Sequence, residues 1–289
     1  MVDTHALTID VEHWYDATLA ARPPRVDPSH AERELDSILA LLERHGAHAT
    51  FFVLGSLAED LPQCVRRIAA AGHEVACHGL THELLWQLGP ARLRAEAGRA
   101  RALLQDLSGQ EVAGFRAPTW SLDRRTPWAP ATLLALGFSY DASVFPLRTP
   151  LYGAPGAPTS PYLLAGGGGS ILELPPAVLE MGPLRLPVAG GIYWRVLPAG
   201  IVSLALRGQS PRVLYAHPWE AAPAGWSLPR STGLSARFAM RFGRGHLAKV
   251  LDRLLATVRL VSIAEAYENL VRDELRTWSL DAAAITDGS

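Results

Sequence analysis

Two histidines four residues apart are the feature of this sequence with the plainest chemical meaning. His78 and His82 bound the run His-Gly-Leu-Thr-His, which follows a short strand-like segment. One helical turn between them would put both imidazoles on the same side, which is ligand spacing for Zn²⁺ or a similar divalent ion. For the pair alone, solvated or capping histidines are an equal alternative, since the chain has ten histidines.

Two carboxylates near the N-terminus can complete such a site. Asp10 and Glu12 alternate across Val11 at the end of an apolar run, so an extended chain points both to one face. Catalytic metal sites commonly use two histidines and one carboxylate and keep a position open for water. One carboxylate would then bind the ion and the other serve as a base. Taken alone, the pair also fits solvent-facing carboxylates at a strand end.

Polar residues also end three later strand-like runs, at Arg116, Asp141 and His217. A barrel gathers the carboxyl ends of its strands on one face, so these residues can share one mouth with the histidines and the acids. Singly, Arg116 fits a surface ion pair and His217 a core histidine. Their convergence favours an active site.

Alternating predicted strands and helices must position these residues, and the alternation predicts a parallel sheet or barrel with helices outside. The predicted strands are 6–9, 48–54, 73–77, 114–116, 139–141, 171–174, 213–216 and 258–261, and the predicted helices are 28–46, 57–71, 91–107, 130–136, 246–257 and 263–277. Residues 145–169, rich in Pro and Gly, predict a loop or small hairpin on the active face. The tail after Ser279 is predicted to be mobile.

Composition restricts the class of protein. The 289 residues are 48% hydrophobic and 19% charged, which predicts one globular domain over residues 1–289. A net charge of −1 gives no electrostatic footprint for nucleic acid or an anionic membrane. Two cysteines, no signal-like start and no long apolar run predict a reducing, cytoplasmic location without a membrane span. The sequence leaves the oligomeric state open.

Five motifs in order resemble those of the polysaccharide deacetylases, the NodB-homology or carbohydrate esterase family four proteins. They are Thr8-Ile9-Asp10-Val11-Glu12, His78-Gly79-Leu80-Thr81-His82, Gly114-Phe115-Arg116-Ala117-Pro118, Asp141-Ala142-Ser143 and Tyr215-Ala216-His217-Pro218. Further runs, among them Asp10-Val11-Glu12-His13-Trp14 and His217-Pro218-Trp219-Glu220, are most similar to a subgroup associated with bacterial exopolysaccharide biosynthesis.

The resemblance implies a fold and a set of roles. The fold is an α/β class, distorted (β/α) barrel with fewer than eight regular strands, with motifs over residues 4–220 and closing helices over 235–278. The implied activity is removal of N-acetyl groups from amino sugars of a glycan, with a divalent ion, zinc above all, as cofactor. Glu12, His78 and His82 would hold the ion, Asp10 would be the base oriented by Arg116, and His217 would be the acid. His13 is a further candidate ligand.

Substrate contacts are predicted beside these motifs. Trp14, Trp120, Tyr193 and Trp219 are candidates for stacking on sugar rings, with Asp141 as a polar contact, although buried core aromatics are as common. Two other functions stay open, a hydrolase of cyclic amides or ureides in the same superfamily and a carbohydrate-binding protein without catalysis. Retention of Arg116 and His217 argues against the first.

Overall fold

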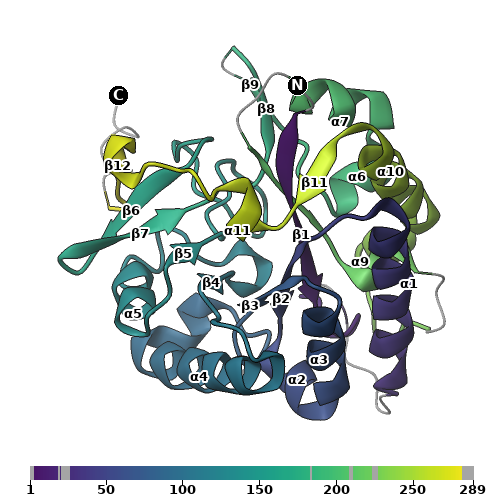
Figure 1. Cartoon of the computed structure of the whole chain (residues 1–289), viewed down its shortest axis with the longest axis horizontal. Helices are drawn as coiled ribbons and strands as arrows, with labels where there is room; N and C mark the ends of the chain where they lie inside the picture. The colour runs from purple at the N-terminus through teal and green to yellow at the C-terminus, as the bar shows by residue number, and fades with distance from the viewer. Residues whose placement is uncertain are drawn as a thin grey trace.

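A mostly parallel sheet with helices packed outside it forms the centre of the chain (Figure 1). The computed structural model describes residues 3–18, 20, 27–182, 184–207, 211–222 and 227–281. Within these ranges the strands are β1 Thr4–Val11, β2 Thr50–Val53, β3 Glu74–Cys77, β4 Gly114–Phe115, β5 Tyr140–Asp141, β6 Tyr162–Gly166, β7 Gly169–Glu173, β8 Val178–Met181, β9 Leu184–Pro187, β10 Val213–Ala216, β11 Arg259–Val261 and β12 Thr277–Trp278.

The strand order defines an incompletely closed barrel. Strands run β10-β1-β2-β3-β4-β5-β7 with parallel pairing throughout. Between β7 and β10 only isolated bridges connect the ends, at Pro176 with Val213 and Gly190 with Tyr215. The predicted α/β class with a mostly parallel sheet is confirmed. The predicted limit of fewer than eight strands holds for this parallel path, whereas β6, β11 and β12 bring the sheet of the described residues to ten strands.

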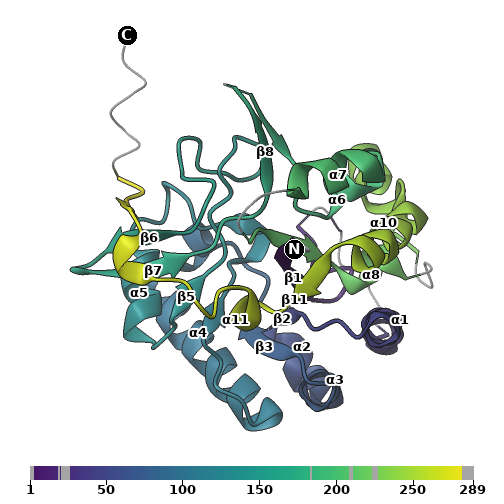
Figure 2. The ribbon, with the colours of Figure 1, turned by 45° about the horizontal axis from the view of Figure 1, so that its top comes forward.

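The helices cover the outside of the sheet (Figures 1 and 2). Those described are α1 Ser29–His45, α2 Gly55–Asp60, α3 Pro62–Ala70, α4 Leu85–Ser108, α5 Ala129–Ala135, α6 Ile192–Val196, α7 Ala199–Leu206, α8 Pro218–Ala221, α9 Leu234–Arg241, α10 Arg244–Thr257 and α11 Ile263–Ala266, with 3₁₀ turns at Pro118–Trp120 and Arg272–Glu274. None of these described helices combines the length and the apolar character that crossing a membrane requires.

Local signals explain the ends of α1 and the break between α2 and α3. Asp27 Oδ1 accepts the backbone N–H of Ser29 at 3.0 Å, and Gly46 ends α1 in the left-handed region at φ 59°. The helix predicted over 57–71 is two helices, because Pro62 starts a new one after Leu61 leaves helical geometry.

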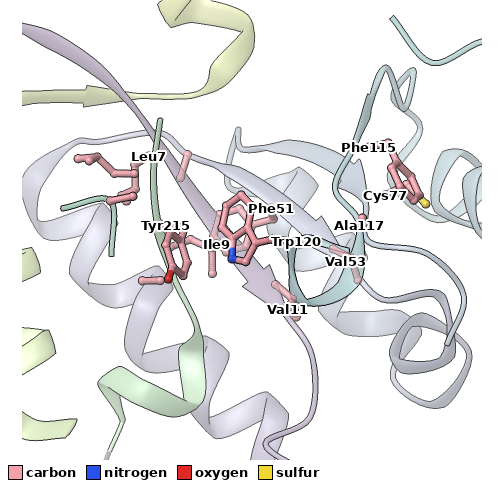
Figure 3. Close-up of a cluster of buried hydrophobic side chains, with 14 of the residues drawn as sticks. Leu7, Ile9, Val11, Phe51, Val53, Cys77, Phe115, Ala117, Trp120 and Tyr215 are labelled. Carbon is pink, nitrogen blue, oxygen red and sulfur yellow. The ribbon is translucent and has the colours of Figure 1, made fainter. Parts of the chain in front are cut away.

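The core lies mainly between the sheet and the helices. Leu7, Ile9 and Val11 alternate along β1 and belong to one buried cluster with Phe51 and Val53 of β2 (Figure 3), which also includes apolar residues of α1. The alternate residues of β1, Thr8 and Asp10, face the barrel interior, where Thr8 Oγ1 donates to the Leu214 carbonyl at 2.7 Å. The same alternation therefore builds the core and directs polar groups to the site.

One predicted segment differs from the structure, and another, predicted as a loop or small hairpin, contains a hairpin strand. The predicted closing helix 263–277 is wrong. Only Ile263–Ala266 is α-helical, a 3₁₀ turn follows at Arg272–Glu274, and Thr277–Trp278 instead pairs with β6 at the sheet edge. The Pro- and Gly-rich segment contains β6, which pairs antiparallel with β7 around Gly167 and Gly168. Residues 282–289 of the predicted mobile tail lie outside the described residues.

Candidate metal and catalytic site

A cavity of about 180 Å³ opens where β1, β3 and β10 end. Its lining includes Asp10, Glu12, His78, His82, Arg116, Trp120, Leu151, Tyr152, Arg195, Tyr215, His217, Trp219 and Glu220. The convergence predicted from strand ends is thus present for every acid, histidine and arginine except Asp141.

Backbone hydrogen bonds that continue the sheet beyond its strands place the ligand residues. The His78 N–H donates to the Val53 carbonyl at 3.0 Å, and the Arg116 N–H donates to the Cys77 carbonyl at 2.9 Å. The segment between His78 and His82 is a bend around Gly79 at φ 83° and not the helical turn that the spacing suggested. The two rings still meet, with centroids 5.4 Å apart.

Three buried side chains converge as a candidate metal site. One ligand atom each of Glu12, His78 and His82 lies within 4.8 Å of the others. Glu12 Oε2 is 2.7 Å from His82 Nε2 and 3.8 Å from His78 Nε2. His78 Nδ1 donates to the Arg116 carbonyl at 2.9 Å. This hydrogen bond fixes the orientation of the His78 ring and leaves the lone pair of Nε2 directed at the candidate metal site.

The donor set fits a divalent cation. Burial lowers the pKa of His78 to about 4, so its imidazole is neutral at neutral pH. Although burial alone would raise it, the neighbouring histidines hold the pKa of Glu12 well below its usual range. The Nε2 atoms of both histidines face the same Glu12 oxygen, so a bound cation can take the place of the proton that joins Glu12 and His82. Two histidines and one carboxylate are a set that zinc accepts.

His13 does not belong to this group. Among the described residues, the one cluster of three or more potential ligands consists of Glu12, His78 and His82. The His13 ring stacks on Tyr15 with centroids 4.7 Å apart, and its Nε2 lies 3.9 Å from an Asp60 oxygen. The geometry therefore gives no support to His13 as a further ligand.

Asp10 is held by a buried guanidinium. Arg116 Nη1 donates to Asp10 Oδ1 at 2.6 Å and to Thr8 Oγ1 at 2.7 Å, and its Nε donates to the Ala142 carbonyl at 2.9 Å. The side chain is fully buried, with its Cζ 4.1 Å from the centre of the Phe52 ring. Asp10 Oδ2 is left on the cavity side, 3.9 Å from His217 Nε2. This fixed carboxylate has the geometry of a base.

His217 is oriented by two residues that sequence patterns gave no role. Its Nδ1 lies 2.7 Å from Glu220 Oε2, and Glu220 Oε1 lies 3.1 Å from Arg195 Nε. Burial opposes protonation of the imidazole, yet the carboxylates of Glu220, Glu12 and Asp10 raise the pKa of His217 to about 9. Its Nε2 is 3.8 Å from Glu12 Oε1, so a protonated ring faces the candidate metal site.

Asp141 lies beneath the cavity and does not line it. The side chain is fully buried and accepts the Ser143 hydroxyl at 2.6 Å, while Ser143 Oγ accepts the Ala117 N–H at 2.7 Å. Through these two hydrogen bonds Asp141 holds the backbone next to Arg116 in position. Asp141 therefore has a structural role, and it does not make the predicted substrate contact because it does not line the cavity.

The predicted aromatic contacts divide into two groups. Trp120 and Trp219 line the cavity, and the Trp219 indole donates to Glu12 Oε1 at 3.2 Å. Trp14 packs in a separate buried cluster with Trp219. Tyr193 reaches the site indirectly, with its hydroxyl 3.3 Å from that of Tyr152. Tyr152, from the Pro- and Gly-rich segment, lines the cavity and was not predicted.

The structure combines an incompletely closed α/β barrel with a candidate centre of two histidines and one carboxylate. Residues 27–136 match the family profile of the polysaccharide deacetylases, and residues 142–268 match a domain of unknown function (DUF3473). The profile thus assigns residues 27–136 to the polysaccharide deacetylases. His78, His82 and Arg116 fall in the first matched range and His217 in the second, whereas Asp10 and Glu12 precede both.

Named relatives and solved structures agree with this assignment. A chitooligosaccharide deacetylase of Sinorhizobium fredii is 40% identical over 107 residues, 36% of this chain and 50% of that protein. A peptidoglycan-N-acetylglucosamine deacetylase of Bacillus cereus is 33% identical over 32% of this chain and 34% of that one. The match thus spans half or less of these relatives.

The similarity of fold extends over almost the whole chain. A candidate polysaccharide deacetylase from Mycobacterium smegmatis superposes with a TM-score of 0.59 at 24% identity, covering 94% of this chain and 91% of that one. A family-four pseudoenzyme from Bacillus anthracis gives 0.51 at 14% identity, covering 92% and 65%. At these identities the comparison concerns the fold alone.

Proposed function

We propose that this chain is a metal-dependent hydrolase that removes the N-acetyl group from an amino sugar of a glycan. The observation that carries the proposal is the convergence of Glu12, His78 and His82 in one cavity with the Asp10–Arg116 pair and His217. The named deacetylases among its relatives support N-acetylated sugars as the substrate class.

Glu12, His78 and His82 would hold the ion, with zinc as the candidate. When bound, such an ion supplies a Lewis acid that activates water and polarises a carbonyl oxygen. Trp219 donates to Glu12 Oε1 and the Arg116 carbonyl accepts from His78, so two of the three ligands are held in place by neighbouring groups.

Asp10 is the base of the proposed reaction. Its Oδ1 is occupied by Arg116, so Oδ2 is the atom that accepts a proton from the attacking water. The hydrogen bond from Arg116 fixes the orientation of the carboxylate, with Oδ2 towards the cavity. The new bond joins the water oxygen to the acetyl carbon.

His217 is the acid of the same reaction. Its Nε2 faces the cavity 3.9 Å from Asp10 Oδ2, and Glu220 holds Nδ1 on the opposite side of the ring. The proton on Nε2 passes to the amide nitrogen as the carbon–nitrogen bond breaks. The products are acetate and the free amine of the sugar, and no other reactant is consumed.

We also propose, on the resemblance of the motifs, that the glycan is an intermediate of exopolysaccharide synthesis and that the protein acts in the cytoplasm. Lining by Trp120, Trp219 and Tyr152 supports a carbohydrate ligand, because aromatic rings provide an apolar face with a polar edge.

Acetate release from N-acetylglucosamine oligomers tests the proposed function. We expect Asp10→Asn to lower the rate by about 100-fold or more while bound metal is retained, because general base catalysis is lost and the ligands are not. Asp252→Asn, at an exposed carboxylate paired with His45, is the matched control and should leave the rate unchanged. Loss of metal from Asp10→Asn would overturn the assignment of its role.

A further inference from the structure

Helix α9 presents a line of exposed apolar side chains. Leu234, Phe238 and Phe242 are 86%, 60% and 43% exposed, and their spacing of four residues puts them along one side of the helix. The two phenylalanine rings stack with centroids 4.7 Å apart. These three side chains therefore form a continuous ridge, called the α9 ridge below.

The chain around this ridge is strongly basic. Residues 227–251 contain four arginines and one lysine and no aspartate or glutamate, whereas the whole chain has a net charge of −1. Arg230, Arg241 and Lys249 are exposed, and Arg237 donates to backbone carbonyls of Thr232 and Pro229. The near-zero net charge thus conceals a local cluster of positive charge beside exposed apolar surface.

The opposite side of α9 faces the active site. Ala239 and Met240 line the cavity that contains Glu12 and His217. Met240 is buried and packs in the same cluster as Trp219. Figure 1 shows α9 on the side of the molecule that carries α1, α6 and α10. Whatever binds the α9 ridge is therefore brought close to the cavity mouth.

We propose that the α9 ridge and its basic neighbours dock this protein on the surface of an anionic phospholipid bilayer. A helix with apolar residues on one side and cations beside them lies in the headgroup region, where apolar burial and attraction to anionic lipids act together. Among the described residues, α1 and α10 carry no large exposed apolar side chain, whereas Val196 of α6 is 53% exposed beside Arg195, which donates to the Phe242 carbonyl.

Vesicle sedimentation tests the proposal with the full chain. Two vesicle types are compared, phosphatidylcholine alone and phosphatidylcholine with phosphatidylglycerol. We expect binding to the anionic vesicles only, weakened by salt, since the attraction acts through screened charges. Arg241→Gln should weaken binding about fivefold, the effect of one cation near the surface. The double variant Phe238→Ser with Phe242→Ser should weaken it about tenfold or more.

Leu204→Ser is the matched control, because Leu204 is 63% exposed on α7 and outside the α9 ridge. It should bind anionic vesicles as the unaltered protein does. Equal binding to both vesicle types, absence of binding, or unchanged binding by the double variant would overturn the proposal. Capture of an acidic protein without vesicle binding would assign the ridge to a protein partner instead and would also overturn it.

The docking and the proposed deacetylation can fail separately. Phe238 and Phe242 do not line the cavity, so acetate release from a soluble oligomer should be the same in the double variant. The dependence of binding by the unaltered protein on lipid charge and salt needs no variant, so it tests the proposal even where a substitution disturbs folding.

Discussion

Two buried carboxyl groups on neighbouring strands make the stability of this protein depend on pH. Asp141 and Glu173 are paired in register between β5 and β7, and both are fully buried. Glu173 Oε1 accepts the N–H groups of Ser143 and Val144 at 3.1 and 2.9 Å. Burial raises the pKa of Glu173 well above its ordinary value, and the adjacent Asp141 raises it further. We therefore expect Glu173 to be protonated and to donate to Asp141.

Glu173→Gln removes this titration while keeping the shape and a donor. The folded pKa of Glu173 lies above its ordinary value of 4.5, so the folded protein holds a proton that the unfolded chain releases above that pH. The contribution of Glu173 to the free energy of unfolding is therefore highest at low pH and falls as pH rises towards the folded pKa. Within that window the fall is about 1.4 kcal/mol per pH unit, or about 3 kcal/mol over two units.

Urea unfolding followed by tryptophan fluorescence at a series of pH values from about 4.5 upwards measures this slope. The free energy of unfolding of Glu173→Gln, relative to that of the unaltered protein, should rise by about 1.4 kcal/mol for each pH unit until the folded pKa is passed. Glu268→Gln, at an exposed carboxylate, is the control and should follow the unaltered protein. Parallel curves for Glu173→Gln and the unaltered protein would refute the protonated pair.

Two further predictions concern the packing and the site. Gly190→Ala should lower the free energy of unfolding by more than about 3 kcal/mol, because its Cβ would lie 1.6 Å from the Tyr215 carbonyl oxygen. Gly46 is also at positive φ, but nothing lies near its Cβ position, so Gly46→Ala should lower the free energy of unfolding by only about 1 kcal/mol. Equal losses of stability for Gly190→Ala and Gly46→Ala in thermal unfolding would contradict the close contact between Gly190 and Tyr215. Glu220→Gln should lower kcat for acetate release by about 10- to 100-fold with bound metal and KM unchanged, because it orients His217. An unchanged kcat would remove that role.

The metal ligands were predictable because each stands in or next to a short strand with a clear pattern. Glu12 directly follows β1, and His78 follows β3. Parallel strands put their carboxyl ends at one edge, so the order of elements along the chain suffices to bring such residues together. The helical turn expected between His78 and His82 was not needed, since a bend at Gly79 brings the rings together as well.

The supporting residues could not be found in this way. Arg195 lies on the short helix α6, and its contact with Glu220 depends on how that helix packs beside β10. Likewise, Asp141 ends a strand as predicted, but the sequence does not reveal that Glu173 lies beside it in the next strand of the sheet. Both contacts join residues far apart in the sequence, so they follow from the tertiary structure and not from a local pattern.

Overall charge was also a poor guide to local surfaces. The net charge of −1 predicted no attraction to an anionic membrane, yet acids are absent from residues 227–251 and cations cluster there. Where the charges lie, and which apolar side chains stand beside them, becomes visible only once α9 is placed in the fold.

Acetate release measured against bound metal tests the central claim most directly. The protein is stripped of metal, zinc is added back in steps, and both bound zinc and acetate from an N-acetylglucosamine oligomer are measured at each step. Since Glu12, His78 and His82 form a single candidate site among the described residues, acetate release should rise in proportion to bound zinc and level off at about one ion per chain. Full acetate release by the stripped protein would contradict the account.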